Sequence, residues 1–420
     1  MNNQQSTVGY VELVRNNRNF RFLWLGQLVS LLGDWFNLIA SATLIAILTE
    51  SGLAVGGLFI VRMLAPFLVS PIAGVVADRF NRKNILVATD IVRSVTLLCF
   101  LLIRDPGDIW LLYVLTAIQM GISGFFTPTR TAFLGDLVSK RELGAANAIS
   151  ASTWSVMLSV GAALGGLVSG LWGIYPAFII DSATFLVSAL FILQIRSEPS
   201  PDAVERGESA LNSALSKYLK GLNYLWGNRG ILFITLHKAM VAAIAGSTFE
   251  IVQVAIAKEI FSIGVGGSLG LGLMFMMTGL GSGISPILAR IFTGDSNHRL
   301  SWAIAAGYAT VAIGYIVVFP LANFGLTLLG IALRGFGGGM IWAFSSQLLL
   351  QQVPSHMRGR VFATEFATFM LIASIGAFLV GQALDTFSIS NVIAGLATII
   401  VLPGTLWTIW IFYQMRKAKL

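Results

Sequence analysis

Ionisable side chains inside long apolar runs are the residues of this sequence that could do chemistry. Asp34 lies midway along an apolar run at 20–48, and Arg62 lies at a comparable depth in the next run, 54–77. An ionisable group at the centre of a bilayer costs at least about 2.5–3.5 kcal/mol, so each one needs a partner or a function. We expect Asp34 to contact Arg62 and to exchange a proton. A static ion pair that only fixes one helix against the next is the alternative.

Glu250 is a second candidate for binding a proton or another cation. An offset of 215 residues, which also relates other parts of the chain, carries Asp34 onto Phe249, the neighbour of Glu250. A carboxylate at nearly the same depth in a related segment could share the role of Asp34. Because Glu250 also lies near Lys258, a merely solvated carboxylate remains the other interpretation.

Further ionisable residues lie in other apolar runs. Asp90 and Arg93 are one helical turn apart, and we expect them to pair with each other. Arg334 lies where glycines thin the helix packing, and it either neutralises an acidic partner or meets an anionic group. We expect Lys238 to reach the membrane interface through its long side chain. Asp181 has no partner nearby in the sequence.

Patterns typical of enzymes and metal sites are not found. The three histidines, His237, His298 and His356, are too dispersed for a metal site. No phosphate-binding loop of the GxxxxGK[ST] type is present. We therefore expect a protein that is not an enzyme and holds no metal or organic cofactor. Its energy source is then an ion gradient, with protons as the expected ion.

Composition shows the kind of environment that surrounds these charges. Of the 420 residues, 56% are hydrophobic and 11% are charged, whereas soluble domains carry about 25% charged residues. The chain is therefore predicted to be an all-α protein that crosses a membrane many times. The single cysteine, Cys99, lies in an apolar run and is expected to be a packing residue.

Twelve apolar runs are long enough to cross a bilayer, since a span needs about 20 residues. They lie at 20–48, 54–77, 84–103, 109–127, 145–170, 174–195, 230–256, 264–289, 300–320, 324–350, 360–383 and 389–413. The polar stretch 1–19 lacks the pattern of a cleaved signal peptide, so the first helix is expected to act as an uncleaved signal.

Positive charge predicts how these spans are oriented. With a cytoplasmic N-terminus, 21 of the 27 Lys and Arg residues fall on the inside, and only Arg104 and Lys258 fall outside. Both termini are therefore predicted to be cytoplasmic, in a multi-pass protein of the inner or plasma membrane. The net charge of +8 is then a feature of orientation rather than of nucleic-acid binding. We expect a monomer whose partners are the lipid bilayer and a small-molecule substrate.

The chain is predicted to consist of two similar halves joined by a linker. The tripeptide Ser-Pro-Ile at 70–72 recurs at 285–287, at the same offset of 215. The predicted parts are a six-helix half at 1–195, a cytoplasmic linker at 196–228 and a second six-helix half at 229–420. Leucines at helical spacing beside lysines predict an amphipathic helix in the linker, lying on the inner leaflet or packed under the bundle.

The stretch Gly74-Val-Val-Ala-Asp78-Arg79-Phe-Asn-Arg82-Lys83 resembles the signature loop between helices 2 and 3 of the major facilitator superfamily of transporters. The resemblance implies twelve helices in two halves, with Gly74 making a tight turn. It also implies that the loop acts as a latch, in which Asp78 contacts Arg130 and the start of helix 11. The latch residues are Gly74, Asp78, Arg79, Arg82, Lys83, Arg130 and Arg358. The alternative is that these charges only set the topology.

Other motifs resemble the macrolide-efflux and enterobactin-exporter branch of that superfamily. They include Phe-Phe-Thr-Pro-Thr-Arg at 125–130, Gly33-Asp34, and Val-Pro at 353–354. Gly-Ala-Ala-Leu-Gly-Gly at 161–166 is similar to the glycine-rich antiporter motif, but Ala162 stands where that motif usually has proline. This branch implies export.

The resemblance also implies a central cavity lined by the first helix of each half. Candidate cavity residues are Trp24, Gln27, Trp35, Asn37, Arg62, Gln119, Arg334, Trp342 and Gln347. The expected function is proton-coupled export, by antiport and alternating access, of amphipathic small molecules that are drug-like or siderophore-like. A lysolipid or organic-anion transporter or flippase is the alternative, and a non-transporting receptor on the same fold is a third possibility.

Overall fold

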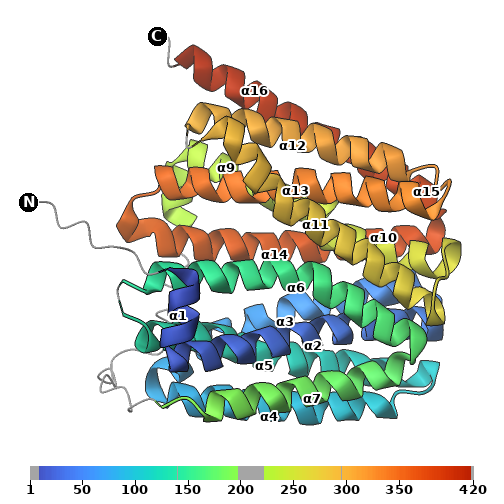
Figure 1. The fold of residues 1–420 in the computed structure, drawn as a ribbon. Coiled ribbons are helices and arrows are strands. Elements are labelled where there is room, and N and C mark those ends of the chain that lie inside the picture. The colour runs from blue at the N-terminus through green and yellow to red at the C-terminus, as the bar shows by residue number, and fades with distance from the viewer. Residues whose placement is uncertain (1–8, 140, 197–221, 295, 418–420) are drawn as a thin grey trace, which may run out of the picture. The chain divides into compact units, whose positions relative to one another are not determined.

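The chain folds into helices. The computed structural model describes residues 9–139, 141–196, 222–294 and 296–417, and all regular elements within those ranges are helical (Figure 1). Twelve helical segments in this described part are long and apolar enough to cross a membrane. The predicted all-α class and the number of spans are therefore confirmed.

The first seven helices cover the sequence up to residue 193. They are α1 (Tyr10–Asn16), α2 (Arg18–Thr49), α3 (Gly52–Arg79), α4 (Arg82–Cys99), α5 (Ile109–Leu137), α6 (Leu143–Leu171) and α7 (Ile174–Leu193). Two short 3₁₀ turns, η1 (Phe100–Leu102) and η2 (Pro106–Asp108), join α4 to α5.

The remaining helices begin at residue 229. They are α9 (Arg229–Ala245), α10 (Ser247–Ala255), the π-helical turn η3 (Ile256–Ile260), the 3₁₀ turn η4 (Val265–Gly267), α11 (Ser268–Thr293), α12 (Asn297–Val318), α13 (Phe324–Gln352), α14 (Ser355–Thr386), α15 (Ile389–Ile399) and α16 (Val401–Lys417). The seventh span consists of α9, α10 and η3, and the twelfth consists of α15 and α16.

Two compact units make up the chain. One contains Met1–Ser41 and Val61–Asn212, and the other contains Ala42–Ile60 and Ser213–Leu420. The end of α2 and the start of α3 thus belong to the second unit. The amphipathic helix predicted within 196–228 falls largely on residues 197–221, which lie outside the described part of the chain.

Small side chains let the helices of the first unit approach closely. A Cβ atom at Gly161 would lie 2.7 Å from Cδ1 of Trp35, so the glycines of α6 admit the aromatic side chains of α2. Neighbouring α4 and α7, which lie side by side in Figure 1, are joined by the hydroxyls of Ser94 and Ser182, 2.8 Å apart. Helices in lipid associate through such close packing and short polar contacts.

The segment 74–83 forms the end of α3, a short bend and the start of α4. Because α3 continues through Gly74 and ends at Arg79, the prediction that Gly74 makes the turn is wrong. The chain bends at Phe80 and Asn81 instead, and the Asn81 side chain accepts a hydrogen bond from the Asn84 N–H at 3.2 Å. Asparagine is a favoured helix cap because it satisfies an N–H group that has no partner within the helix.

The seventh span is broken at Gly246, between α9 and α10. The break leaves the carbonyls of residues 243–245 without their usual helical donors. Thr248, Tyr315 and Arg334 donate side-chain hydrogen bonds to these three carbonyls in turn, Thr248 at 2.6 Å and Tyr315 at 2.5 Å. Irregular backbone at membrane depth is tolerated only where protein or water satisfies it. These three side chains therefore stabilise the break.

The start of α3 is bound by a carboxylate from α14 within the second unit. Asp385 accepts hydrogen bonds from the Ser51 hydroxyl at 3.0 Å and from the N–H groups of residues 52–53 at 2.5 and 3.3 Å. A carboxylate there also matches the positive end of the helix dipole. Close by, Lys258 donates to the Ala46 carbonyl at 2.6 Å.

Candidate functional site

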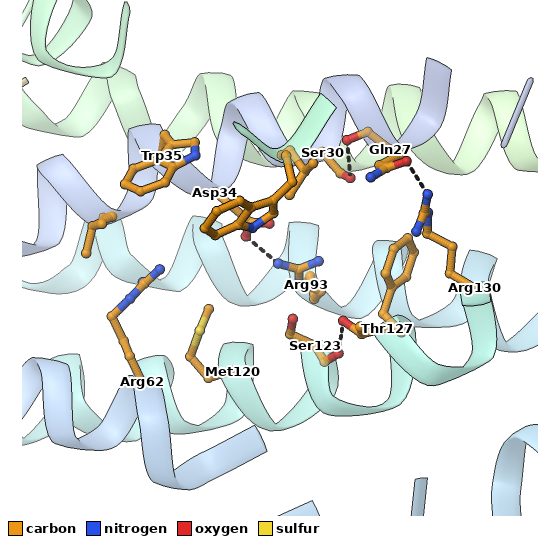
Figure 2. Close-up of a pocket in the computed structure, with 14 residues that line it drawn as sticks. Gln27, Ser30, Asp34, Trp35, Arg62, Arg93, Met120, Ser123, Thr127 and Arg130 are labelled. Carbon is orange, nitrogen blue, oxygen red and sulfur yellow. Dashed lines mark hydrogen bonds and ion pairs between the residues drawn. The ribbon is translucent and has the colours of Figure 1, made fainter. Parts of the chain in front are cut away.

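A cavity of about 350 Å³ lies in the first unit, between α2, α3, α4, α5 and α6 (Figure 2). Its charged wall residues are Asp34, Arg62, Arg93 and Arg130. The apolar part of the wall is Leu31, Trp35, Leu38, Met120, Phe126 and Trp154, and Gln27, Ser30, Ser123 and Thr127 complete it. The cavity therefore combines three guanidinium groups, one carboxylate and a large aromatic surface.

Asp34 is joined to Arg93 of α4 by an ion pair (Figure 2). The Asp34 side chain is 26% exposed in the cavity, whereas that of Arg93 is 2% exposed. The guanidinium of Arg93 also lies over the ring of Phe185, 3.9 Å from its centroid. Asp90, the predicted partner, interacts electrostatically with Arg93, but the ion pair of Arg93 is with Asp34 rather than with Asp90 of its own helix.

Arg62 donates a hydrogen bond to Oδ1 of Asn37 at 3.2 Å. The predicted contact between Asp34 and Arg62 is thus replaced by two separate contacts, Asp34 with Arg93 and Arg62 with Asn37. Both arginines still reach the same cavity, as Figure 2 shows. Asn37 is buried one helical turn from Asp34, on the adjoining face of α2.

Among the described side chains, the hydrogen-bond partners of Arg130 are neutral. Its guanidinium donates to the side-chain oxygen of Gln27 and, at 3.0 Å, to the hydroxyl of Ser150. These bonds connect α5 to α2 and α6. The side chain of Asp78, the predicted latch partner of Arg130, is outside the described part of the structure, so that contact stays a prediction.

The other predicted latch residues have specific neighbours. Arg82 forms an ion pair with Asp136 of α5 at 2.6 Å, and Lys83 donates to the Ile195 carbonyl at 2.8 Å. Arg358 donates to the Val353 carbonyl at 3.1 Å, while Arg79 is exposed. The sequence did not point to Asp136 as the carboxylate that meets this cluster.

A buried ion pair occupies the second unit. Lys238 of α9 pairs with Glu365 of α14, and their side chains are only 4% and 6% exposed. Lys238 also donates to the Ser346 hydroxyl at 2.8 Å and lies 3.8 Å from the ring centroid of Trp342. The prediction that Lys238 reaches the membrane interface is therefore wrong.

Glu250 lies half-buried in the first turn of α10. Arg334 is buried in α13 and interacts electrostatically with Glu250. Its guanidinium also lies 4.2 Å from the ring centroid of Phe249. Arg334 therefore interacts with the Glu250 carboxylate, the Phe249 ring and the Ala245 carbonyl at the helix break.

The remaining predicted cavity residues are scattered. Trp24 lies in a separate groove beside α6 and donates to the Thr153 hydroxyl at 2.8 Å. Gln119 is fully buried, and neither its oxygen nor its nitrogen has a hydrogen-bond partner. Gln347 is half-buried in α13. Of the predicted set, Gln27, Trp35 and Arg62 line the cavity with Asp34.

Three carboxylates with close charged neighbours were missed or left unassigned by sequence reasoning. Glu365 was missed because it lies near the start of its apolar run, where a solvated residue was expected. Asp90 was expected to form the ion pair of Arg93, and Asp181 was assigned no partner. Gly33 of α2 lies directly against Asp181 of α7, a contact between helices that the local sequence does not reveal. Within the described part of the chain, no three His, Cys, Asp or Glu residues converge as metal ligands would.

Known relatives of this chain are membrane transporters. The provisionally named bacilysin exporter BacE of Bacillus subtilis (strain 168) is 24% identical over 388 residues, 91% of this chain and 92% of that protein. The multi-drug resistance efflux pump PmrA homolog of Lactococcus lactis subsp. lactis (strain IL1403) is 27% identical over 377 residues, 87% of this chain and 85% of that protein. The match to the uncharacterized MFS-type transporter YfiS of Bacillus subtilis (strain 168), 28% identical, spans 51% of this chain and 50% of that protein.

Solved structures show the same fold. A bacterial homolog of the human lysosomal transporter Spinster, in an inward-facing and unoccupied conformation, superimposes with a TM-score of 0.71 and 16% identity, covering 94% of this chain and 95% of that one. A POT family transporter in complex with 5-aminolevulinic acid has a TM-score of 0.72 and 9% identity, covering 94% and 96%. The sequence profile of the Major Facilitator Superfamily matches residues 23–377. With twelve spans and a charged cavity between its first helices, this chain belongs to the major facilitator superfamily.

Proposed function

We propose that this protein is a proton-coupled exporter that moves amphipathic small molecules by alternating access. The observation that carries the proposal is the Asp34–Arg93 ion pair on the wall of a cavity that also has a large aromatic surface. Asp34 is exposed enough to exchange a proton with cavity water, and Arg93 is buried behind it. Asp34 can therefore exchange its ion pair with Arg93 for a proton while its side chain stays in the cavity wall.

The walls of the cavity favour a substrate with an apolar body and a charged group. Trp35, Phe126 and Trp154 offer aromatic faces, which bind apolar rings and also attract cations. Two relatives that align over most of this chain carry the names of an exporter and an efflux pump, which supports outward transport. We place the protein in the plasma membrane as a monomer, driven by an ion gradient and without a bound cofactor.

A second candidate function is transport of an organic anion, including a lysolipid. Arg130 favours it, because its guanidinium reaches the cavity and, among the described side chains, donates to the neutral Gln27 and Ser150. An anionic headgroup could form a two-pronged contact with such a guanidinium. The two candidates therefore differ in the sign of the charge that the substrate brings to this cavity.

Purified protein in liposomes tests the proposal. A pH gradient is imposed, a pH-sensitive dye is enclosed, and cationic drugs, macrolides, catecholate siderophores and lysolipids are added in turn. We expect an amphipathic member of the panel to drive proton flux, and we expect Asp34→Asn to abolish that flux while folded protein remains in the membrane. Asp105→Asn, an exposed carboxylate in the loop before α5, is the matched control and should behave as wild type.

The outcomes separate the candidates. Wild-type flux in the Asp34→Asn variant would eliminate the proton role of Asp34. Movement of lysolipids or organic anions without proton flux, lost in Arg130→Gln, would establish the second candidate instead.

A further inference from the structure

Three carboxylates from three helices interact electrostatically with Arg93. Asp34 comes from α2, Asp90 from α4 and Asp181 from α7. Asp34 holds the ion pair with Arg93, whereas Asp90 and Asp181 are fully buried. Only Asp34 of the three lines the cavity. One buried cation therefore faces more carboxylates than it can neutralise.

Asp181 lies directly against the backbone of α2. A Cβ atom on Gly33 would lie 3.1 Å from the Asp181 carboxyl carbon, so only glycine leaves room for this side chain. The Thr184 hydroxyl is shared between the Asp181 backbone carbonyl at 2.7 Å and Oδ1 of Asp181 at 3.2 Å, and Oδ2 has no partner. The carboxyl is thus held one residue from Asp34 with half of its hydrogen-bonding capacity unused.

Asp90 is even less satisfied. The Ser188 hydroxyl is its nearby donor, yet neither oxygen of Asp90 nor the Ser188 hydroxyl completes a hydrogen bond. The Nε atom of Arg93 is likewise buried without a partner. An ionised carboxylate that is buried and unpaired is strongly disfavoured.

The charges in this cluster do not balance unless a proton is present. Asp181 interacts electrostatically with Asp34, Arg93 and Arg62, and Asp90 interacts with Arg93 and Asp34. If all were ionised, three negative charges would face two positive ones. Arg62 also lines the cavity and donates to Asn37, so one negative charge is left over even with both arginines counted. A proton on one of the carboxyls neutralises this excess charge.

We propose that Asp181 is a proton-binding residue of the transport cycle, and that Arg93 moves from Asp34 to Asp181 when that proton leaves. The inference rests on the proposed function. In the exchange the O–H bond of Asp181 breaks and an O–H bond forms on Asp34, directly or through a water molecule, while the guanidinium crosses in the opposite direction. The total charge of the cluster stays constant. Asp34 then passes the proton to the cavity, which Asp181 does not reach.

Infrared spectroscopy of the purified protein tests the assignment. A protonated aspartic acid has a carbonyl stretch that a carboxylate lacks. We expect a component of this band in wild-type protein at neutral pH to be lost in Asp181→Asn and retained in the control Asp105→Asn. We also expect gradient-driven transport by Asp181→Asn to fall to the level measured without a gradient.

Two results would overturn the inference. The band could persist unchanged in Asp181→Asn, or it could be lost in Asp90→Asn alone, which would place the proton on the other buried carboxyl. If Asp181→Asn does not fold, Thr184→Val removes only the hydroxyl bonded to Asp181. This variant should change the pH at which the band disappears, and an unchanged pH would overturn the inference equally.

The test separates this inference from the proposed function. Proton flux that depends on Asp34, together with a band that survives Asp181→Asn, would leave the exporter standing and remove only the role of Asp181. Substrate movement without any proton flux would remove the exporter mechanism, whatever the spectrum shows.

Discussion

At the scale of single residues, the protein places each buried cation beside a carboxylate from another helix or beside neutral donors and acceptors. Lys238 and Glu365 are the clearest example, because both are buried and Ser346 and Trp342 complete their surroundings. Two charges removed from water attract each other strongly, but each has lost its hydration. The contribution of such a pair to stability is therefore seen most clearly when one of its two charges is removed by substitution.

Glu365→Gln should destabilise the protein strongly, since it leaves the Lys238 ammonium buried beside a neutral amide. Breaking a buried pair costs about 3–5 kcal/mol. The double variant Lys238→Met, Glu365→Leu should recover most of that loss, because it removes both charges. Thermal unfolding in detergent measures both variants. If the double variant is no more stable than the single one, the pair is not the source of the effect.

The charged residues of the site could be found from the sequence, but their partners could not. Composition makes Asp34, Arg93 and Lys238 conspicuous within apolar runs. Which side chains meet depends on which helices are neighbours and on how each is rotated about its axis. Sequence spacing reports only contacts within one helix, and for that reason it suggested Asp90 for Arg93. The carboxylate of Asp34, on another helix, is the observed partner.

At the scale of elements, the break in the seventh span was not predicted. Hydropathy detects the length of an apolar run, and both sides of Gly246 are apolar. The local signal is the sequence Gly246-Ser247, since kinks occur at such pairs. The carbonyls at the break are satisfied by side chains from α12 and α13, so the bend depends on residues that are distant in the sequence.

Tyr315→Phe should weaken this bend without changing its shape. The substitution removes the hydroxyl that donates to the Ile244 carbonyl and leaves a buried acceptor unpaired, which costs about 1–3 kcal/mol. Tyr413→Phe, at a tyrosine that is 61% exposed, is the matched control. Hydrogen exchange near Gly246 should become faster in Tyr315→Phe only. Equal exchange in both variants would mean that the hydroxyl does not support the break.

At the scale of the whole molecule, the number of spans and the helical class followed from composition and run length alone. The orientation of the chain remains a prediction from the distribution of Lys and Arg. This rule is statistical, and the charges of the loops act while the chain is inserted into the membrane. The folded structure therefore does not itself show which side of the membrane each loop faces.

Cysteine labelling determines the orientation. In a Cys99→Ala background, which removes the single native thiol, Glu259→Cys and Arg141→Cys each place one thiol at an exposed position. We expect a membrane-impermeant maleimide to label position 259 in intact cells and position 141 only after permeabilisation. The opposite pattern would show that the predicted topology is inverted, with the loops assigned to the cytoplasm facing outward.

Asp385 concentrates three hydrogen bonds from the start of α3 on one carboxylate. The three donors share this one acceptor side chain, so a single substitution at Asp385 would leave all three without it. In a protein that alternates between two conformations, every 1.4 kcal/mol by which it favours one of them changes their ratio about tenfold. A ligand can reverse that ratio only through the difference in its affinity for the two states. Under the proposed mechanism, any difference in the strength of this contact between the two conformations adds to the free energy that substrate and ion must supply.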